Sequence, residues 1–287
     1  MKKLIFLLFI CLQTGAQTIS FKGKLLDKET NKPVVYANIS FLKMNAGISS
    51  LEDGTFNLEI DKKLLQEKIH ISCLNYNDTI VLAENLQQKT LFLQPKSFEL
   101  NEVVISKRKN KKVVLDKVKR RVFPLHSNEI RLIGKYFSNK LENTFFIDRI
   151  DIYFPKRDSQ KAKFRIRLFS VDELTGKPNE DVLNENIPIS IEKGEKKVTL
   201  NLENYYLQFP KNGIYVVFEK LLIPENVYEW SFNNKNKEKY YAPVIGLTKS
   251  KEYINLNKIC YFNKGNWYFV PDDKSLSVPA ISLTLSN

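Results

Sequence analysis

His126 and Glu129 are the first residues in this 287-residue chain whose types and spacing suggest catalysis. A His-x-x-Glu pair can supply two zinc ligands of a metallopeptidase, and such a catalytic site needs a third protein ligand. The only other histidine is His70, far upstream in a segment with strand-like alternation. We therefore expect no zinc site.

Nucleophilic catalysis has little support in the sequence. There is no Gly-x-Ser-x-Gly elbow, and two histidines provide little material for a general base. Cys73 follows His70 by three residues, which on a strand places the two side chains on opposite faces. The ten glycines form neither a P-loop nor a Gly-x-Gly-x-x-Gly run. These patterns predict a protein that is not an enzyme and holds no cofactor.

Paired carboxylates are the one catalytic arrangement that the sequence leaves open, because glycosidase acids can come from any two strands. The candidates are acidic residues that lie at the ends of apolar segments, namely Glu219, Glu225, Glu229, Asp272 and Asp273. Loop and cap roles are the favoured interpretation. A carboxylate-dependent glycan hydrolase stays as an alternative.

Aromatic residues gather in the second half of the chain and are a better indication of a ligand site. Tyrosine and tryptophan suit binding surfaces because one end of each side chain tolerates water. Packing inside a two-sheet core is the alternative interpretation, since about half of the residues in a strand point inward. The residues predicted as ligand contacts are Trp230, Tyr241, Tyr205 and Trp267.

The first third of the chain alternates between apolar and polar positions, as half-buried strands do. Ile19, Phe21 and Leu25 share one face, and similar patterns recur at 35–41, 56–60, 70–72, 79–82 and 91–93. Asp53-Gly54 precedes one of these segments and is a strong hairpin signal. About seven short strands with turns between them predict a β-sandwich.

This region also resembles a known family. The features that carry the resemblance are Gly23, Pro33, Ala37, the run 47–56, the segment 71–76 and Leu100-Asn101-Glu102-Val103-Val104-Ile105. They resemble the carboxypeptidase-like regulatory domain of envelope proteins from Bacteroidetes-type bacteria. The resemblance implies a prealbumin-like β-sandwich over residues 17–106 without catalytic residues. Many members precede a TonB-dependent transporter, but nothing plug-like follows Ile105, so we expect a stand-alone accessory protein.

A basic linker is expected at residues 107–129. Val114, Leu115, Val118 and Val122 recur at helical spacing, which predicts a short amphipathic helix over residues 111–123. Because lysine and arginine cover its other faces, residues 107–121 are a candidate for contact with an anionic membrane surface. Packing of the apolar stripe against a neighbouring domain is the favoured alternative.

Residues 130–287 return to a strand pattern. Alternation is clearest at 150–154, 164–168, 187–191, 198–202 and 281–285. Residues 214–223 form a long apolar run typical of a central strand buried on both faces, and residues 263–266 predict a tight hairpin. About eight strands without a long helix predict a jelly-roll-like β-sandwich, and the whole chain is expected to be all-β.

Residues 1–16 have the pattern of a secretory signal peptide, with Lys2-Lys3, an apolar run and small residues at Thr14-Gly15-Ala16. No segment beyond it approaches the roughly 20 apolar residues of a membrane helix. The formal charge of +13 falls to +11 without Lys2 and Lys3. In an exported chain this surplus favours an acidic envelope surface or glycan over nucleic acid as partner, although a lysine-rich solvated surface is the simpler explanation. Whether Cys73 and Cys260 form a disulfide bond is left open.

Together these features predict a non-catalytic protein of the periplasm or outer membrane that binds an unidentified envelope protein or glycan. A purely structural scaffold is the main alternative.

Overall fold

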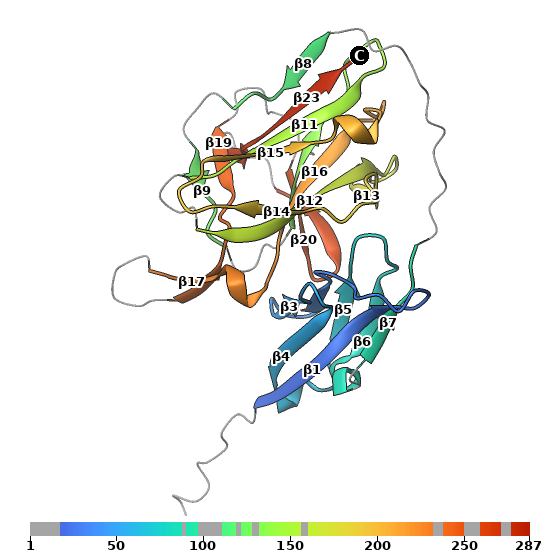
Figure 1. Ribbon diagram of the computed structural model, residues 1–287, viewed down its shortest axis with the longest axis vertical. Helices are drawn as coiled ribbons and strands as arrows, with labels where there is room; N and C mark the ends of the chain where they lie inside the picture. The colour runs from blue at the N-terminus through green and yellow to red at the C-terminus, as the bar shows by residue number, and fades with distance from the viewer. Residues whose placement is uncertain are drawn as a thin grey trace, which may run out of the picture.

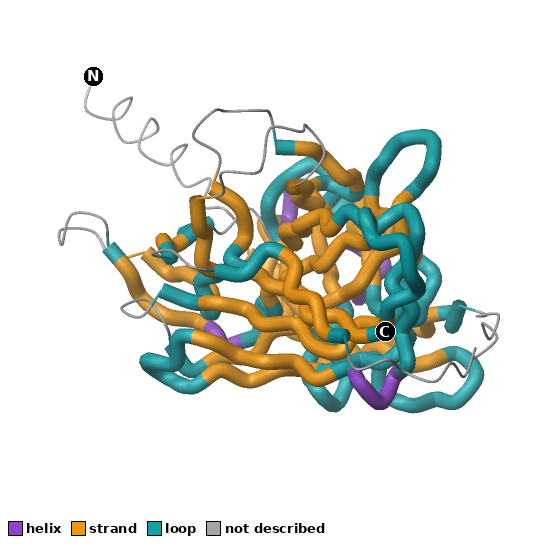
Figure 2. Tube along the Cα trace, turned by 90° about the horizontal axis from the view of Figure 1, so that it is seen from above, coloured by secondary structure: helices purple, strands orange, loops and turns teal. Residues whose placement is uncertain are grey.

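The computed structural model describes most of the chain, and strands dominate it (Figure 2). Within this part, helical structure is limited to short 3-10 turns between strands, and no helix is long and apolar enough to cross a membrane. The described residues are 18–87, 90–96, 111–118, 122–127, 132–155, 160–231, 238–249, 259–270 and 277–287. The all-β prediction is confirmed.

Residues 18–96, which we call the N-terminal unit, form two sheets at the lower end of the molecule in Figure 1. One sheet has the order β4-β1-β7 and the other β3-β2-β5-β6, with β7 parallel to β1. The elements are β1 (Thr18–Asp27), β2 (Asn38–Phe41), β3 (Gly47–Ser49), β4 (Thr55–Asp61), η1 (Lys62–Leu64), β5 (Lys68–Ser72), β6 (Thr79–Leu82), η2 (Ala83–Gln87) and β7 (Thr90–Leu93).

The core of the N-terminal unit lies between these sheets, as the alternating pattern predicts. Phe56, Leu58 and Ile60 of β4 are buried, whereas the intervening Asn57 and Glu59 are exposed. The two sheets therefore hold their apolar faces together, which is the sandwich expected from the sequence.

The Asp53-Gly54 turn forms, but the predicted hairpin is wrong. Gly54 has a φ of 77°, and its amide donates a hydrogen bond to the carbonyl of Leu51. The strands on either side then join different sheets, because β3 pairs with β2 and β4 pairs with β1. The turn moves the chain from one sheet to the other, and the ten-residue strand β1 offers β4 a longer partner than the three-residue β3.

Residues 111–287, which we call the C-terminal unit, form the larger upper part of Figure 1. Its elements are β8 (Lys112–Leu115), β9 (Phe123–Pro124), β10 (Leu132–Phe137), β11 (Phe146–Tyr153), β12 (Ala162–Val171), β13 (Pro178–Asp181), β14 (Pro188–Ile191), β15 (Lys197–Asn201), η3 (Glu203–Tyr205), β16 (Ile214–Lys220), η4 (Pro224–Asn226), β17 (Val227–Trp230), β18 (Glu238–Tyr241), β19 (Gly246–Lys249), β20 (Ile259–Asn263), β21 (Asn266–Phe269), β22 (Ser277–Pro279) and β23 (Ile281–Ser286).

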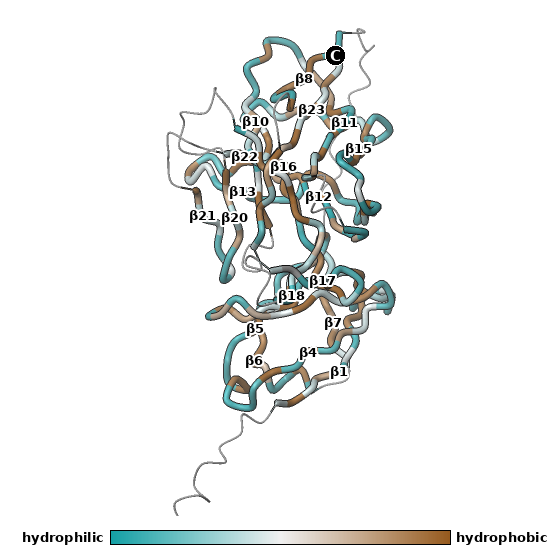
Figure 3. Tube along the Cα trace, turned by 90° about the vertical axis from the view of Figure 1, so that its left-hand side faces the viewer, coloured by the Kyte–Doolittle hydropathy of each residue, from teal (hydrophilic) through white to brown (hydrophobic). Residues whose placement is uncertain are grey.

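Two sheets of the C-terminal unit enclose its main core. A seven-stranded sheet has the order β13-β12-β16-β10-β20-β21 with β14 beside β12, and a four-stranded sheet has the order β15-β11-β23-β8. Every residue of β16 is buried, so the central-strand prediction for this run is confirmed. Figure 3 shows β16 as a largely hydrophobic segment inside this unit.

The seven-stranded sheet curls strongly on the face away from the main core. The rings of Phe169 on β12 and Trp267 on β21 lie 5.5 Å apart, although three strands separate β12 from β21. Gly134 on β10 lies where this curl is crowded, since a Cβ there would be 2.7 Å from the Sγ atom of Cys260. The missing side chain lets the neighbouring strands approach.

Residues 263–266 form the predicted tight hairpin between β20 and β21. Asn263 pairs with Asn266, and Lys264 and Gly265 have φ values of 50° and 77°. Positive φ at both central residues is the geometry that favours glycine in a two-residue β-turn. A Cβ on Gly265 would lie 2.9 Å from the side chain of Leu42, so the turn rests against the N-terminal unit.

The linker helix predicted for residues 111–123 is wrong. Residues 112–115 form β8, an edge strand that pairs with β23, and residues 119–121 lie outside the described part. Val113 and Leu115 pack against the main core while Val114 is 44% exposed. Side chains thus alternate between the two faces, as in a strand, and do not follow the helical spacing. The predicted helical stripe therefore does not form in residues 112–115, and membrane contact by 107–121 loses its structural basis there.

The crowding at Gly134 gives a testable prediction. We expect Gly134→Ala to lower the free energy of unfolding by about 1–3 kcal/mol, because the added methyl group overpacks the curled face. Adding Cys260→Ala should recover part of this loss by removing the sulfur atom that the methyl group meets. Urea denaturation measures both, and losses that simply add in the double variant would contradict the explanation.

Candidate functional site

The contacts between the two units, which we call the seam, are organised by one buried arginine. Arg165 projects from β12 and is fully buried. Its Nε donates to Oε2 of Glu219 on β16 at 2.7 Å, and its Nη2 donates to the backbone carbonyl of Tyr36 at 3.1 Å. The Arg165 side chain therefore binds the backbone of the N-terminal unit, while the Glu219 carboxylate on the neighbouring strand neutralises its charge.

Two asparagines extend this network across the seam. Asn38 on β2 donates from Nδ2 to Oε1 of Glu219 at 3.3 Å. Asn186 accepts from Nη1 of Arg165 at 3.0 Å and donates to the carbonyl of Val35 at 3.2 Å. The buried ion pair is thus surrounded by hydrogen bonds, as a desolvated pair requires for stability.

Charge and burial act in opposite directions on Glu219. Burial by itself would raise the pKa of its carboxyl group, but the charges of Arg165 and Arg167 outweigh that effect. The pKa of Glu219 is therefore lowered, and the carboxylate stays ionised. Arg167 in turn forms an ion pair with Asp181.

An apolar cluster completes the seam. Tyr36 packs with Leu221 and Ile223, and all three are at most 1% exposed. Tyr36 has a φ of 56°, a conformation that is strained for a residue with a large side chain. Its carbonyl group is the one that accepts from Arg165, and its hydroxyl donates to Glu52 at 2.6 Å. The surrounding seam holds the residue in this conformation.

Sequence reasoning missed this seam because Arg165 and Arg167 alternate with the apolar residues of segment 164–168, and the polar face of an alternating strand ordinarily meets solvent. A usable signal was present in the next strand. Glu219 interrupts an apolar run that was predicted to be buried on both faces. A carboxylate inside such a strand needs a cationic partner, and an arginine on a neighbouring strand is the obvious source.

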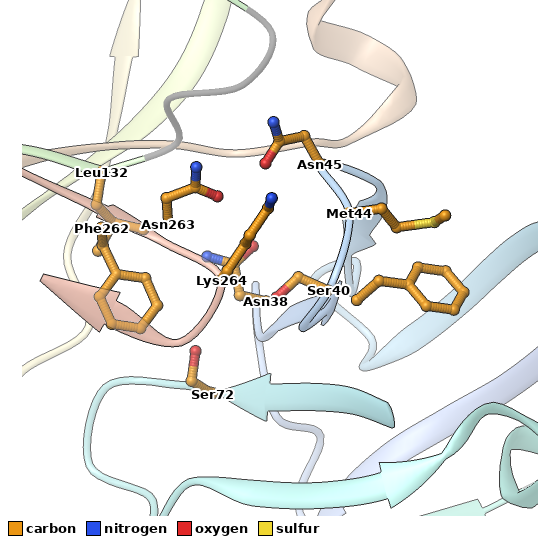
Figure 4. A pocket seen from close by; sticks show the side chains of 10 residues that line it. Asn38, Ser40, Met44, Asn45, Ser72, Leu132, Phe262, Asn263 and Lys264 are labelled. Carbon is orange, nitrogen blue, oxygen red and sulfur yellow. The ribbon is translucent and has the colours of Figure 1, made fainter. Parts of the chain in front are cut away.

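A small polar cavity lies beside this network (Figure 4). Its volume of about 30 Å³ accommodates one or two water molecules and is too small for a sugar ring. Asn38 contributes an amide oxygen, Oδ1, that accepts no hydrogen bond from the described residues. The lining residues are Asn38, Ser40, Phe41, Met44, Asn45, Ser72, Leu132, Phe262, Asn263 and Lys264. We regard this cavity as part of the seam.

The β17–β18 hairpin carries two of the predicted ligand contacts and is separate from both large sheets. Tyr241 lies at the end of β18 opposite Val227, and is partly buried. Trp230 ends β17, where its backbone pairs with Glu238; its side chain lies outside the described part. We call this two-stranded ribbon the aromatic hairpin; β17 is labelled at the left of Figure 1.

A histidine contacts this hairpin. Nδ1 of His126 lies 3.5 Å from the hydroxyl oxygen of Tyr228, and its ring packs edge-on against Tyr240 with centroids 6.2 Å apart. Glu129, the other member of the His-x-x-Glu pattern, lies outside the described residues. His126 thus joins an aromatic cluster.

A buried lysine holds the segment next to His126. Nζ of Lys220 donates to the carbonyl of Ser127 at 2.6 Å, and Lys220 is 5% exposed. Burial lowers its pKa from 10.5 to about 8. A charged lysine in this position therefore costs folding free energy at neutral pH.

The other two predicted contacts lie elsewhere and take part in packing. Tyr205 in η3 packs against the main core, and its hydroxyl donates to Glu185 at 2.8 Å. Trp267 packs edge-on against Phe169 and Phe262 on the curled face. Its neighbour Tyr268 is the exposed aromatic residue of that strand, at 44%.

The predicted catalytic candidates are also dispersed. Glu225 forms an ion pair with Lys163 at 3.5 Å, Glu229 is exposed on β17, and Asp272 and Asp273 lie outside the described residues. His70 lies 2.9 Å from Asp78 in the N-terminal unit. In the part of the chain that the structure describes, no cluster of histidine, cysteine or acidic residues could hold a metal ion.

Cys73 and Cys260 are buried free thiols, so they form no disulfide bond with each other. This answers the question that the sequence left open. Burial raises the pKa of each, which keeps them protonated and unreactive at neutral pH.

Loss of Arg165 should weaken the fold more than loss of an exposed arginine. We expect Arg165→Met to lower the free energy of unfolding by about 3–5 kcal/mol, because Glu219 is left buried and unpaired. The control Arg149→Met should cost under about 1 kcal/mol, since its ion pair with Asp151 is half-exposed. Urea denaturation compares them. If Glu219→Leu fails to restore stability to Arg165→Met, the unpaired charge is not the cause.

Lys220 should make stability depend on alkaline pH. Its folded-state pKa lies below the unfolded value, so between about pH 8 and 10.5 the unfolded chain binds one more proton. Stability should therefore rise across this range, by up to about 3 kcal/mol. The effect should disappear in Lys220→Met and persist in the exposed control Lys196→Met. Urea denaturation at pH 7.5 and 9.5 measures it, and the same increment in all three proteins would contradict it.

The fold and these sites define a two-part β protein whose parts are joined by a buried polar seam. Residues 21–105 match the family described as CarboxypepD_reg-like domain, which confirms the resemblance inferred from the sequence for the first third of the chain. No curated protein sequence matches this chain.

Solved structures show distant likenesses. The cysteine protease and lectin-like domains of Cwp84, a surface layer associated protein of Clostridium difficile, give a TM-score of 0.38 at 13% identity over 63% of this chain and 37% of that chain. Clostridial Cwp84 after propeptide cleavage gives 0.41 at 10% identity over 96% and 73%. A putative carbohydrate binding protein from Bacteroides uniformis gives 0.19 at 12% identity over 79% and 97%. This chain thus spans just over a third of the first of these structures, and such distant likenesses assign it no function.

Proposed function

We propose that this protein is a non-catalytic, exported envelope protein that binds a protein or glycan partner through the aromatic hairpin. The observation that carries the proposal is the position of the hairpin. It belongs to neither large sheet, yet β17 and β18 together contain Tyr228, Trp230, Tyr240 and Tyr241. A two-stranded ribbon is marginally stable by itself, and here Tyr228 packs against the main core and Tyr240 is buried. A ribbon anchored in this way favours a role in recognition for Tyr241 and Trp230.

The N-terminal unit fits this proposal as a docking module. It matches a regulatory-domain family, and the sequence resemblance implies an envelope protein without catalytic residues in that unit. Export to the periplasm or outer membrane follows from the signal-like pattern of residues 1–16. The positive charge of the chain favours partners that carry acidic groups.

A structural scaffold is the second candidate, and the seam is the observation that favours it. A scaffold needs rigid connection between its parts, and the buried Arg165–Glu219 pair with the cluster around Tyr36 provides one. In that case the protein would bind no partner. Arg165→Met, which disrupts the seam, would then impair the function of the protein more than any variant of the aromatic hairpin.

Binding by purified protein tests the first candidate. On a glycan array and in pull-downs with envelope extract, we expect Tyr241→Ala and Trp230→Ala each to weaken the interaction at least tenfold, because the contact of a sugar ring or a partner side chain with an aromatic ring is lost. Leu174→Ala is the control, since Leu174 is 96% exposed on a turn far along the chain from the hairpin. Unchanged binding in both hairpin variants would remove the site, and no binding to any partner would favour the scaffold.

A further inference from the structure

The two sheets of the N-terminal unit differ in their number of strands. One has the strand order β3-β2-β5-β6, and the other has only β4-β1-β7. Strands β3 and β4 are outer strands of their sheets, and the Asp53-Gly54 turn connects them. In the smaller sheet, β4 is therefore an edge strand that pairs only with β1 among the described strands.

A groove lies at this place. It has a volume of about 460 Å³, many times that of the cavity at the seam. Its lining combines apolar side chains of the sandwich interior with the backbone of β4, and includes Phe41, Ala46, Ile48, Leu58, Ile60 and Leu64. A strand laid beside β4 would place its inward side chains against these apolar residues.

The backbone of β4 is available along this groove. The carbonyl of Thr55 accepts from Leu51, and β1 pairs with β4 along its other edge. From Phe56 to Asp61, no described residue bonds to the outer edge of β4. A row of unpaired backbone groups is the template on which an extended peptide can add a strand.

The side chains of β4 indicate the composition of that strand. Leu58 and Ile60 face the interior and favour apolar neighbours, whereas Glu59 faces outward and is exposed. Ser20 is opposite Glu59 on β1, and no described cation pairs with this carboxylate. A lysine or arginine opposite Glu59 on the added strand would give a favourable cross-strand pair.

We propose that the edge groove between β3 and β4 binds an extended segment of a partner protein as a fourth strand, and that this segment alternates apolar residues with lysine or arginine. This inference does not rest on the aromatic hairpin, which lies in the C-terminal unit. It gives the N-terminal unit a docking site of its own. The unpaired β4 edge sets the chemistry of the contact, with backbone bonds for affinity and Glu59 for selectivity.

Two capped synthetic heptapeptides test the proposal on the full chain. One has the sequence Thr-Val-Lys-Val-Lys-Val-Thr, and the other carries glutamate in place of lysine. Amide chemical shifts and hydrogen exchange, followed by NMR, report both affinity and location. We expect the lysine peptide to bind at least fivefold more tightly and to protect amides of β4. Glu59→Lys should reverse the preference, whereas Glu180→Lys, on the exposed strand β13, should leave it unchanged.

Three outcomes would overturn the proposal. Equal affinity for both peptides would remove the role of Glu59, and binding without protection of β4 would place the contact elsewhere. A concentration-dependent dimer that protects β4 without peptide, seen by sedimentation and exchange, would show that a second copy occupies this edge. Failure of the aromatic-hairpin variants to affect partner binding has no bearing on these measurements.

Discussion

The buried pair between Arg165 and Glu219 is the interaction on which the arrangement of the two units depends. Both groups give up hydration, and the cost is met by mutual attraction together with bonds to Tyr36, Asn186 and Asn38. Hydrophobic contact alone would allow the units to slide, since it has no direction. The planar guanidinium group fixes register because its donors must meet particular oxygen atoms.

Other buried charged groups of the C-terminal unit are also paired or hydrogen-bonded. Lys135 is 1% exposed and donates to the carbonyl of Ile281 at 2.7 Å, with Asp116 3.5 Å away. Asp148 accepts from Ser286 at 2.7 Å. Lys135 on β10 links the seven-stranded sheet to β23, and Asp148 links β11 to its neighbour β23. The polar interior thus specifies which strands meet, while the apolar core provides most of the driving force.

The sequence predicted strands well where one face was buried and the other solvated. Residues 56–60 and 198–201 are examples, because buried and exposed residues alternate along the strands that form there. The prediction of secondary structure failed where the same residues fitted both the helical and the strand spacing of apolar positions. Val114, Leu115 and Val118 suit a helix, yet β23 offered an open edge, and that partner is invisible in the local sequence.

Site prediction had a similar limit. Clustered aromatic residues singled out Trp230 and Tyr241, but the spacing did not predict that they lie on one separate hairpin. Trp267 was named without knowledge of which face of its strand turns outward. Arg165 was missed because a second unit covers its face, and long-range burial is not encoded in spacing. Composition pointed to aromatic-rich segments, and only tertiary contacts place the individual side chains.

The glycine at the tip of the β20–β21 turn also determines how closely the two units approach. Because Gly265 nearly touches Leu42, the hairpin works as a spacer whose thickness is one backbone. A bulkier residue there would first meet the flexible end of the Leu42 side chain, so it would displace that side chain and loosen the contact between the turn and the N-terminal unit. The relative orientation of the two sandwiches would then depend more fully on the buried ion pair between Arg165 and Glu219.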